Sequence, residues 1–177
     1  MTKTFSRGYT LIELIVAIGL FAVVMTLASG AYLIMIGVNR ETEGLATGID
    51  NLSFVLESMT TAMRTGTGYC SAGDCSSGSS GSTFSFVDQQ GRYVRYGLVG
   101  GTIESCTSTT GFCAPTTALT APAVTITGLT FLPKGVAKGD GYQPYVTITV
   151  SGTVSTGPGK TAPFTVESSV VARGTDI

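Results

Sequence analysis

The most constraining feature of the sequence is an uncharged apolar run of 25 residues, from Leu14 to Val38. As an α-helix that rises about 1.5 Å per residue, this run would extend about 38 Å, more than the ~30 Å hydrocarbon core of a bilayer. A secretory signal peptide is the competing interpretation, but its apolar stretch is shorter and a small-residue cleavage site follows it. Here the small residues Ala28, Ser29 and Gly30 lie inside the run. We therefore expect one membrane-spanning helix.

The charges around this run predict its orientation. Lys3 and Arg7 precede it, so the positive-inside rule predicts a cytoplasmic N-terminus, with Asn39 onward outside the cytoplasmic membrane. Glu13 stands at the start of the apolar stretch. A carboxylate costs about 2.5–3.5 kcal/mol in the middle of a membrane helix and less near its end. Two interpretations of Glu13 remain: its side chain reaches the lipid headgroups, or it pairs with a cation that another chain supplies.

The segment from Arg7 to Leu14 (RGYTLIEL), followed by a long apolar helix, resembles the class III leader of type IV pilins and pseudopilins. The resemblance implies that residues 1–8 are a leader peptide, which a prepilin peptidase cleaves between Gly8 and Tyr9. It also implies N-methylation of the new amino group at Tyr9, where the family usually has Phe. Residues 9–38 would then be the transmembrane and assembly helix. Its expected partners are the bilayer, an inner-membrane assembly platform and other subunits, and Glu13 would pair with a neighbouring subunit's amino group.

The helical pattern continues beyond the apolar run. Apolar residues recur there at alternating spacings of three and four, which predicts an amphipathic continuation over residues 39–64. These residues are Leu45, Ile49, Leu52, Leu56, Met59 and Met63. No proline interrupts the chain from Leu11 to Arg64, so we expect one continuous helix of about 54 residues. Gly44 and Gly48 are expected to weaken or bend it.

The composition changes at Thr65, because Gly, Ser and Thr supply 51 of the 113 residues from 65 to 177. Short alternating runs there predict strands, with turn signals at Gln90-Gly91, Asp140-Gly141 and Gly157-Pro158-Gly159. The predicted strands are 84–87, 93–96, 124–127, 145–150 and 164–171. The predicted fold class is α+β: a long N-terminal helix packed on an antiparallel β-sheet. Residues 65–177 would form an extracytoplasmic head domain.

Four cysteines lie in this predicted extracytoplasmic part: Cys70, Cys75, Cys106 and Cys113. In an exported region they favour two disulfides, and the first choice is the local pairs Cys70–Cys75 and Cys106–Cys113. A zinc site is the alternative, although the two spacings are irregular for a zinc ribbon. The stretch from Ser71 to Thr83 has the composition of a linker.

Other chemistry has little support in the sequence. The chain has no histidine, and no two carboxylates of the head stand at a motif spacing, so we expect no enzyme, cofactor or metal site. A net charge of −1 provides no basic field for nucleic acid, which makes nucleic acid an unexpected partner. Arg92 and Arg95 nevertheless alternate with Tyr93 and Tyr96, a pattern that could contact nucleic acid or could be a solvated strand edge.

Three segments of the head resemble the C-terminal sheet of J-type pseudopilins and W-type minor pilins: Ile126–Phe131, Tyr145–Val150 and Phe164–Arg173. This resemblance implies a minor pilin or pseudopilin, a structural subunit of a type IV pilus or a type II secretion-type pseudopilus. The alternative is a filament-borne binding module that recognises DNA, a surface or a secreted substrate.

Overall fold

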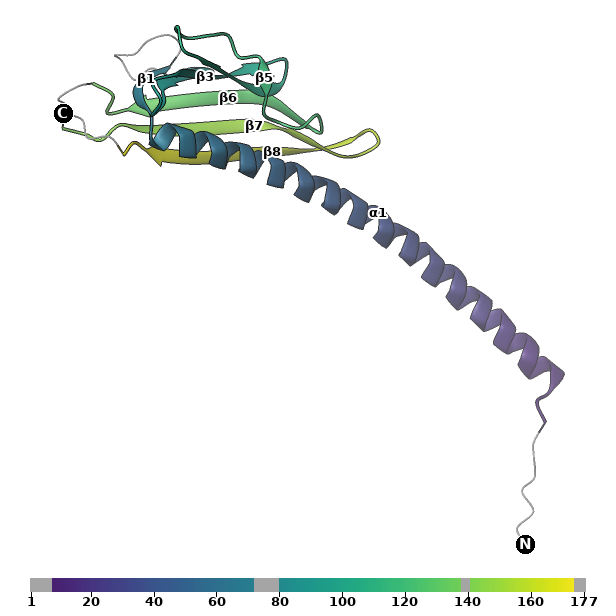
Figure 1. Cartoon of the computed structure of the whole chain (residues 1–177). Coiled ribbons are helices and arrows are strands. Elements are labelled where there is room, and N and C mark those ends of the chain that lie inside the picture. The colour runs from purple at the N-terminus through teal and green to yellow at the C-terminus, as the bar shows by residue number, and fades with distance from the viewer. Residues whose placement is uncertain (1–7, 72–79, 138–140, 174–177) are drawn as a thin grey trace. The chain divides into compact units, whose positions relative to one another are not determined.

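The structure, a computed structural model, describes residues 8–71, 80–137 and 141–173. It begins with one helix, α1 (Leu11–Arg64), whose 54 residues agree with the predicted length and bounds. The chain divides into two compact units, Met1–Glu41 and Thr42–Ile177, which we call the first and the second unit. The helix contributes its initial part to the first unit and its remaining part to the second (Figure 1).

The first sheet is antiparallel and has the strand order β1-β2-β3-β4-β5. Its strands are β1 (Thr67–Ser71), β2 (Thr83–Val87), β3 (Tyr93–Val99), β4 (Thr102–Ser108) and β5 (Thr117–Ala118). The predicted turn at Gln90-Gly91 connects β2 and β3, and Gly91 has a φ of +75° there, which glycine adopts without strain. The centre of the predicted linker lies outside the described residues, and its two ends belong to β1 and β2.

The second sheet is an antiparallel meander of β6 (Val124–Lys134), β7 (Tyr145–Gly157) and β8 (Lys160–Val171). The predicted turn at Gly157-Pro158-Gly159 connects β7 and β8, and Gly159 has a φ of +70°. The other predicted turn is described only from Gly141 onward, because Asp140 lies outside the described residues.

The sequence predicted one sheet, and the structure has two. The segment that connects the two sheets contacts the helix, because the N–H of Ala121 donates to Oδ1 of Asn51 on α1 (2.9 Å). The first sheet ends before this residue, and the second sheet begins after it. A β-bridge joins the region of the first sheet to β6, where Gly81 and Phe131 exchange backbone hydrogen bonds of 3.0 and 2.8 Å. The architecture is α+β, as predicted, with the helix packed against two antiparallel sheets.

The core of the second unit lies between the helix and the sheets. An aromatic stack joins the two sheets, because the ring centroids of Phe84 and Phe131 are 5.3 Å apart. The helix contributes an apolar stripe of Leu52, Val55, Leu56, Met59 and Met63. Burial also raises the pKa of Tyr69 and of Tyr96 to about 12, since a phenolate is poorly solvated there.

The predicted stripe is wrong at one position. Ile49 points outward and is 38 % exposed, and Gly48 takes the place on the buried face. A Cβ at Gly48 would lie only 2.2 Å from Cγ1 of Val154 on β7, so the missing side chain allows the helix to approach the sheet. Gly44 is packed similarly, since its Cβ would lie 3.1 Å from Cα of Thr156. Both glycines are therefore packing positions in the second unit.

Candidate functional site

The assembly helix predicted from the sequence begins at a capped turn. The N–H of Glu13 lies 3.4 Å from Oγ1 of Thr10, and the N–H of Leu14 donates to the carbonyl of Thr10 (3.2 Å). Threonine followed three residues later by glutamate is the capping-box pattern. A carboxylate in the first turn also interacts favourably with the positive end of the helix dipole. This role of Glu13 was missed from the sequence, although Thr10 three residues ahead was the available signal.

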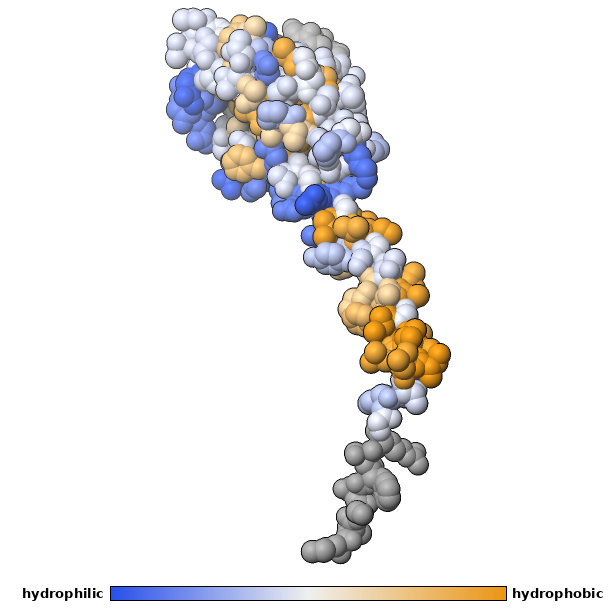
Figure 2. Space-filling model, turned by 90° about the vertical axis from the view of Figure 1, so that its right-hand side faces the viewer, coloured by the Kyte–Doolittle hydropathy of each residue, from blue (hydrophilic) through white to orange (hydrophobic). Residues whose placement is uncertain are grey.

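From Leu11 to Val38 the large apolar side chains of α1 are exposed except for Ile36, which is half-buried, and Leu27 for example is 70 % exposed. In Figure 2 the hydrophobic colour gathers along this part of the helix, whereas the visible surface of the head is mostly pale or hydrophilic. Within the described residues, α1 is long and apolar enough to cross a membrane by length and composition. Glu13 is the one charged residue between Arg7 and Arg40. Such a helix needs an apolar environment around it.

The predicted cleavage site lies just ahead of this helix. Gly8 and Tyr9 precede its first residue, and both are exposed, Tyr9 to 86 %. A Cβ at Gly8 would have no neighbour within 4 Å, so the backbone there is open to an approaching protease. Lys3 and Arg7 of the predicted leader lie outside the described residues.

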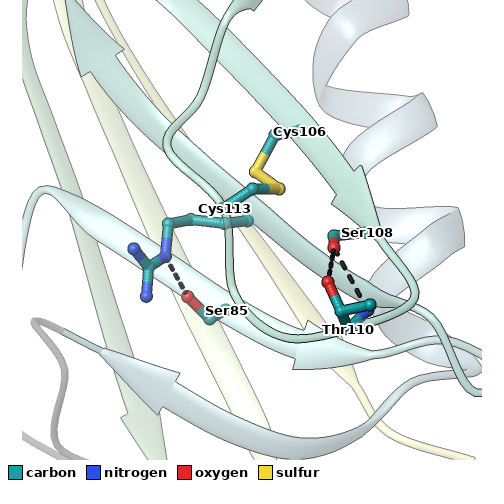
Figure 3. The surroundings of a disulfide bond; sticks show 6 residues. Ser85, Cys106, Ser108, Thr110 and Cys113 are labelled. Atoms are coloured by element: carbon teal, nitrogen blue, oxygen red, sulfur yellow. Dashed lines mark hydrogen bonds between the residues drawn. A yellow bond between two sulfur atoms is a disulfide. The ribbon is translucent and has the colours of Figure 1, made fainter.

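The cysteines of the head are oxidised as far as the structure describes them. Cys106 of β4 and Cys113 form a disulfide with a Cα–Cα distance of 6.0 Å, one of the two local pairings expected from the sequence (Figure 3). Cys70 is also disulfide-bonded, and its predicted partner Cys75 lies outside the described residues. Because a disulfide sulfur is not a thiolate, these three cysteines do not offer the ligands of the zinc alternative.

The two arginines proposed as nucleic-acid contacts have different surroundings. Arg92 lies beside the β2–β3 turn, where its Nε forms a 2.8 Å salt bridge with Asp88 and its backbone N–H donates to the same carboxylate. Desolvation raises the pKa of Asp88, but the hydrogen bonds from Arg92 and Gln90 outweigh it and leave that pKa below its ordinary value. The charge of Arg92 is thus already compensated.

Arg95 lies on β3 and is half-buried. Its Nε donates to Oγ of Ser85 on β2 (2.8 Å), the bond drawn to Ser85 in Figure 3. Its guanidinium carbon lies 5.3 Å from the ring centroid of Phe112, a cation–π contact. The sequence named Arg95 but missed Phe112, which belongs to a Thr/Ser-rich loop without strand periodicity.

The fold and the site together consist of a capped apolar helix that follows a short basic segment and continues into a β-rich part. Residues 4–29 match the family model of the prokaryotic N-terminal methylation motif. The chain therefore carries a class III prepilin leader, consistent with the type IV pilin and pseudopilin family. This motif points to a structural subunit, and it fits an anchored helix near the N-terminus. No curated protein and no solved structure matches this chain.

Proposed function

We propose that this protein is a minor pilin or pseudopilin, a structural subunit of a type IV pilus or of a type II secretion-type pseudopilus. In this proposal residues 1–8 are removed by a prepilin peptidase, and the new amino group of Tyr9 is methylated. Residues 9–38 hold the subunit in the cytoplasmic membrane and then in the filament. Residues 39–64 continue the helix, and residues 65–177 form the extracytoplasmic head.

The observation that carries this proposal is the exposure of the apolar part of α1. Large apolar side chains are exposed on every face of Leu11–Val38, although the same helix packs tightly on the sheets farther along. A plain membrane anchor would account for the apolar side chains but not for the methylation motif at residues 4–29. A helix that first lies in lipid and then packs among other helices accounts for both.

Glu13 gives this packing a register in our proposal. Cleavage after Gly8 creates an amino group at Tyr9, four residues ahead of Glu13. Both charges are costly in an apolar environment, and pairing the carboxylate of one subunit with the amino group of its neighbour relieves both costs. Subunits that are shifted along the helix axis would leave both charges unpaired, so the pair favours one register.

The assignment to the minor branch is supported by the second sheet. The three segments that resemble J-type pseudopilins and W-type minor pilins lie on β6, β7 and β8, which pair with one another along nearly their whole length. The alternative of a DNA-binding module is weakened, because Arg92 is already paired with Asp88. Of the two arginines that the sequence suggested for contact with nucleic acid, Arg95 is then the remaining candidate.

The proposal is tested by the variants Glu13→Ala and Glu13→Gln, expressed together with the filament machinery. Gln at this position still satisfies the capping-box pattern, so it preserves the helix start and removes only the charge. We expect both variants to insert into the membrane and to be cleaved, but to be depleted from sheared filaments. The measurement is the ratio of subunit in the filament fraction to subunit in the membrane fraction.

Thr10→Ala serves as the matched control for helix capping. It removes the side chain that accepts the hydrogen bond of Glu13 N–H and leaves the carboxylate in place. Loss of this cap should cost about 1 kcal/mol of helix stability and leave filament entry intact. Equal incorporation of wild type and both Glu13 variants would show that apolar packing alone directs assembly.

A further inference from the structure

The connection from β4 to β5, residues 109–116, lies over the outer face of the first sheet, and we call it the flap. The Cys106–Cys113 disulfide attaches the flap to β4, and the N–H of Thr116 donates to the carbonyl of Ser105 (3.1 Å). Over β3 the flap passes close to the backbone, since a Cβ at Gly97 would lie 3.2 Å from Cγ of Pro115. The flap is thus held by a disulfide and a backbone hydrogen bond, and it lies close to β3.

Beneath the flap, one cross-strand row lies on the outer face of the sheet. In the register of β1 to β4, Cys70 pairs with Ser85, Ser85 with Arg95, and Arg95 with Cys106. Side chains that are directly opposite in a sheet share a face, and the core residues Phe84 and Tyr96 lie on the other one. Ser85 is nevertheless only 5 % exposed, which shows that this part of the outer face is covered.

Two contacts hold the guanidinium of Arg95 in this row. Ser85 accepts the hydrogen bond of its Nε, and the ring of Phe112 lies against its carbon. Phe112 is itself oriented by Tyr93, because the two rings meet edge to face with centroids 4.9 Å apart. A guanidinium fixed by a hydrogen bond and by a ring has lost much of the freedom of an exposed arginine.

The same guanidinium has no counter-charge within the described part of the chain. Among the residues that the structure describes, no carboxylate lies within ion-pair distance of Arg95, and neither of its Nη atoms donates a hydrogen bond. Arg92, three residues earlier, has both kinds of partner in Asp88. A half-buried, immobilised and uncompensated cation loses solvation, and an anion bound there would compensate it.

We propose that Arg95, as held by Ser85 and the flap, is a binding site for an oxyanion, either a carboxylate or a phosphate group of a ligand. The two Nη groups are free to donate to two oxygens of one such group, a geometry that arginine favours and lysine cannot reproduce. Because the guanidinium is already oriented, binding requires little further ordering of the protein. The site takes a single anionic group, whereas nucleic-acid contact by both arginines would need Arg92 as well.

The test uses the full-length chain in detergent micelles, labelled with ¹⁵N, and follows the Nε–H resonance of Arg95. This proton is hydrogen-bonded to Ser85, which slows its exchange with water. The probes are inorganic phosphate and acetate, with sodium chloride at matched ionic strength. We expect a saturable shift with phosphate, with acetate or with both, and none with chloride. The probe that binds more tightly identifies the phosphate or the carboxylate class.

Three variants sharpen the result. Arg95→Lys keeps the charge and loses the paired donors, so binding should weaken about tenfold. Phe112→Leu keeps the flap apolar but removes the ring, and should also weaken binding. Arg92→Gln is the matched control and should bind like wild type, since the charge of Arg92 is already paired.

If the Nε–H resonance of Arg95 shifted equally with phosphate, acetate and chloride at matched ionic strength, the proposed anion site would be wrong. So would an Arg95→Lys variant that binds as tightly as wild type. The wild-type titration decides the proposal even if a variant fails to fold. It requires no filament, so its outcome is independent of the proposed function in assembly.

Discussion

The two parts of α1 belong to one continuous helix, but the first part exposes its apolar side chains and the second part buries a stripe of them. In the first unit, from Leu11 to Glu41, large apolar side chains are exposed around the helix. In the second unit, from Thr42 to Arg64, a single stripe is buried on the sheets and the opposite face is polar apart from residues such as Phe54. Both parts therefore form helix, and they differ in whether the sheets of the same chain cover one face of that helix.

The glycines show the same contrast. A Cβ at Gly19, Gly30 or Gly37 would have no neighbour within 4 Å, whereas one at Gly44 or Gly48 would press against β7. In the first unit, glycine leaves a smooth helix surface, which suits close approach by other helices. In the second unit, glycine accommodates a contact that already exists within the chain. The same residue type therefore has an intermolecular use in our proposal and an intramolecular use in the structure.

The largest expected difference between the two parts comes from truncating a large side chain. Met59→Ala removes a side chain that is 0 % exposed, so it should lower the free energy of unfolding of the second unit by about 2–5 kcal/mol. Leu27→Ala, in the first unit, should change that free energy by less than about 0.5 kcal/mol. Chemical denaturation of the full chain in micelles, followed by near-ultraviolet circular dichroism, measures both. Equal effects would mean that the comparison of the two parts is wrong.

A smaller effect is expected from adding one methyl group to a glycine. Gly48→Ala places a Cβ against the stiff, buried side chain of Val154, and overpacking of this kind costs about 1–3 kcal/mol. Gly37→Ala meets open space and gains helix propensity, so the second unit should unfold as in wild type. The same denaturation experiment compares them. A neutral Gly48→Ala variant would indicate that the helix does not approach β7 as closely as described.

The smallest expected effect is a dependence of the stability of the second unit on pH. Tyr69 and Tyr96 keep their protons up to a pKa of about 12 in the folded chain, against an ordinary value of 10.0. Since the folded state holds these protons more tightly, stability should be constant below about pH 10 and fall as the pH rises toward 12. Denaturation at several pH values, with tyrosinate absorbance as the second readout, tests this. Tyr96→Phe should reduce the fall, and an unchanged fall would exclude Tyr96 as a contributor.

Much of the fold could be predicted from local patterns. The uninterrupted helix follows from the absence of proline between Leu11 and Arg64, and its end follows from Thr65-Gly66. β6, β7 and β8 contain alternating apolar residues, so their positions were predicted as well. β4 was missed because its sequence, TIESCTS, has little apolar alternation, and pairing with β3 makes it a strand. The division into two sheets depends on contacts between distant residues and has no local signal.

The candidate sites divide in a similar way. Gly8, Tyr9 and Glu13 could be named from the sequence because their spacing is itself the motif. The contact of Arg95 with Phe112 could not, because seventeen positions separate the two residues and a disulfide loop brings them together. The pairing of Arg92 with Asp88 was accessible in principle, since the two charges stand only four positions apart around a Gly-containing turn.

The central claim is that residues 1–8 are a leader and that the apolar helix beyond them belongs to a filament subunit. The most direct measurement is the intact mass of the chain after coexpression with a prepilin peptidase, compared with the chain expressed alone and with Gly8→Val. We predict loss of residues 1–8 and addition of one methyl group for wild type, and no cleavage for Gly8→Val, whose side chain blocks close approach to the backbone. An uncut wild-type chain, or cleavage near Ala28-Ser29-Gly30, would contradict the account.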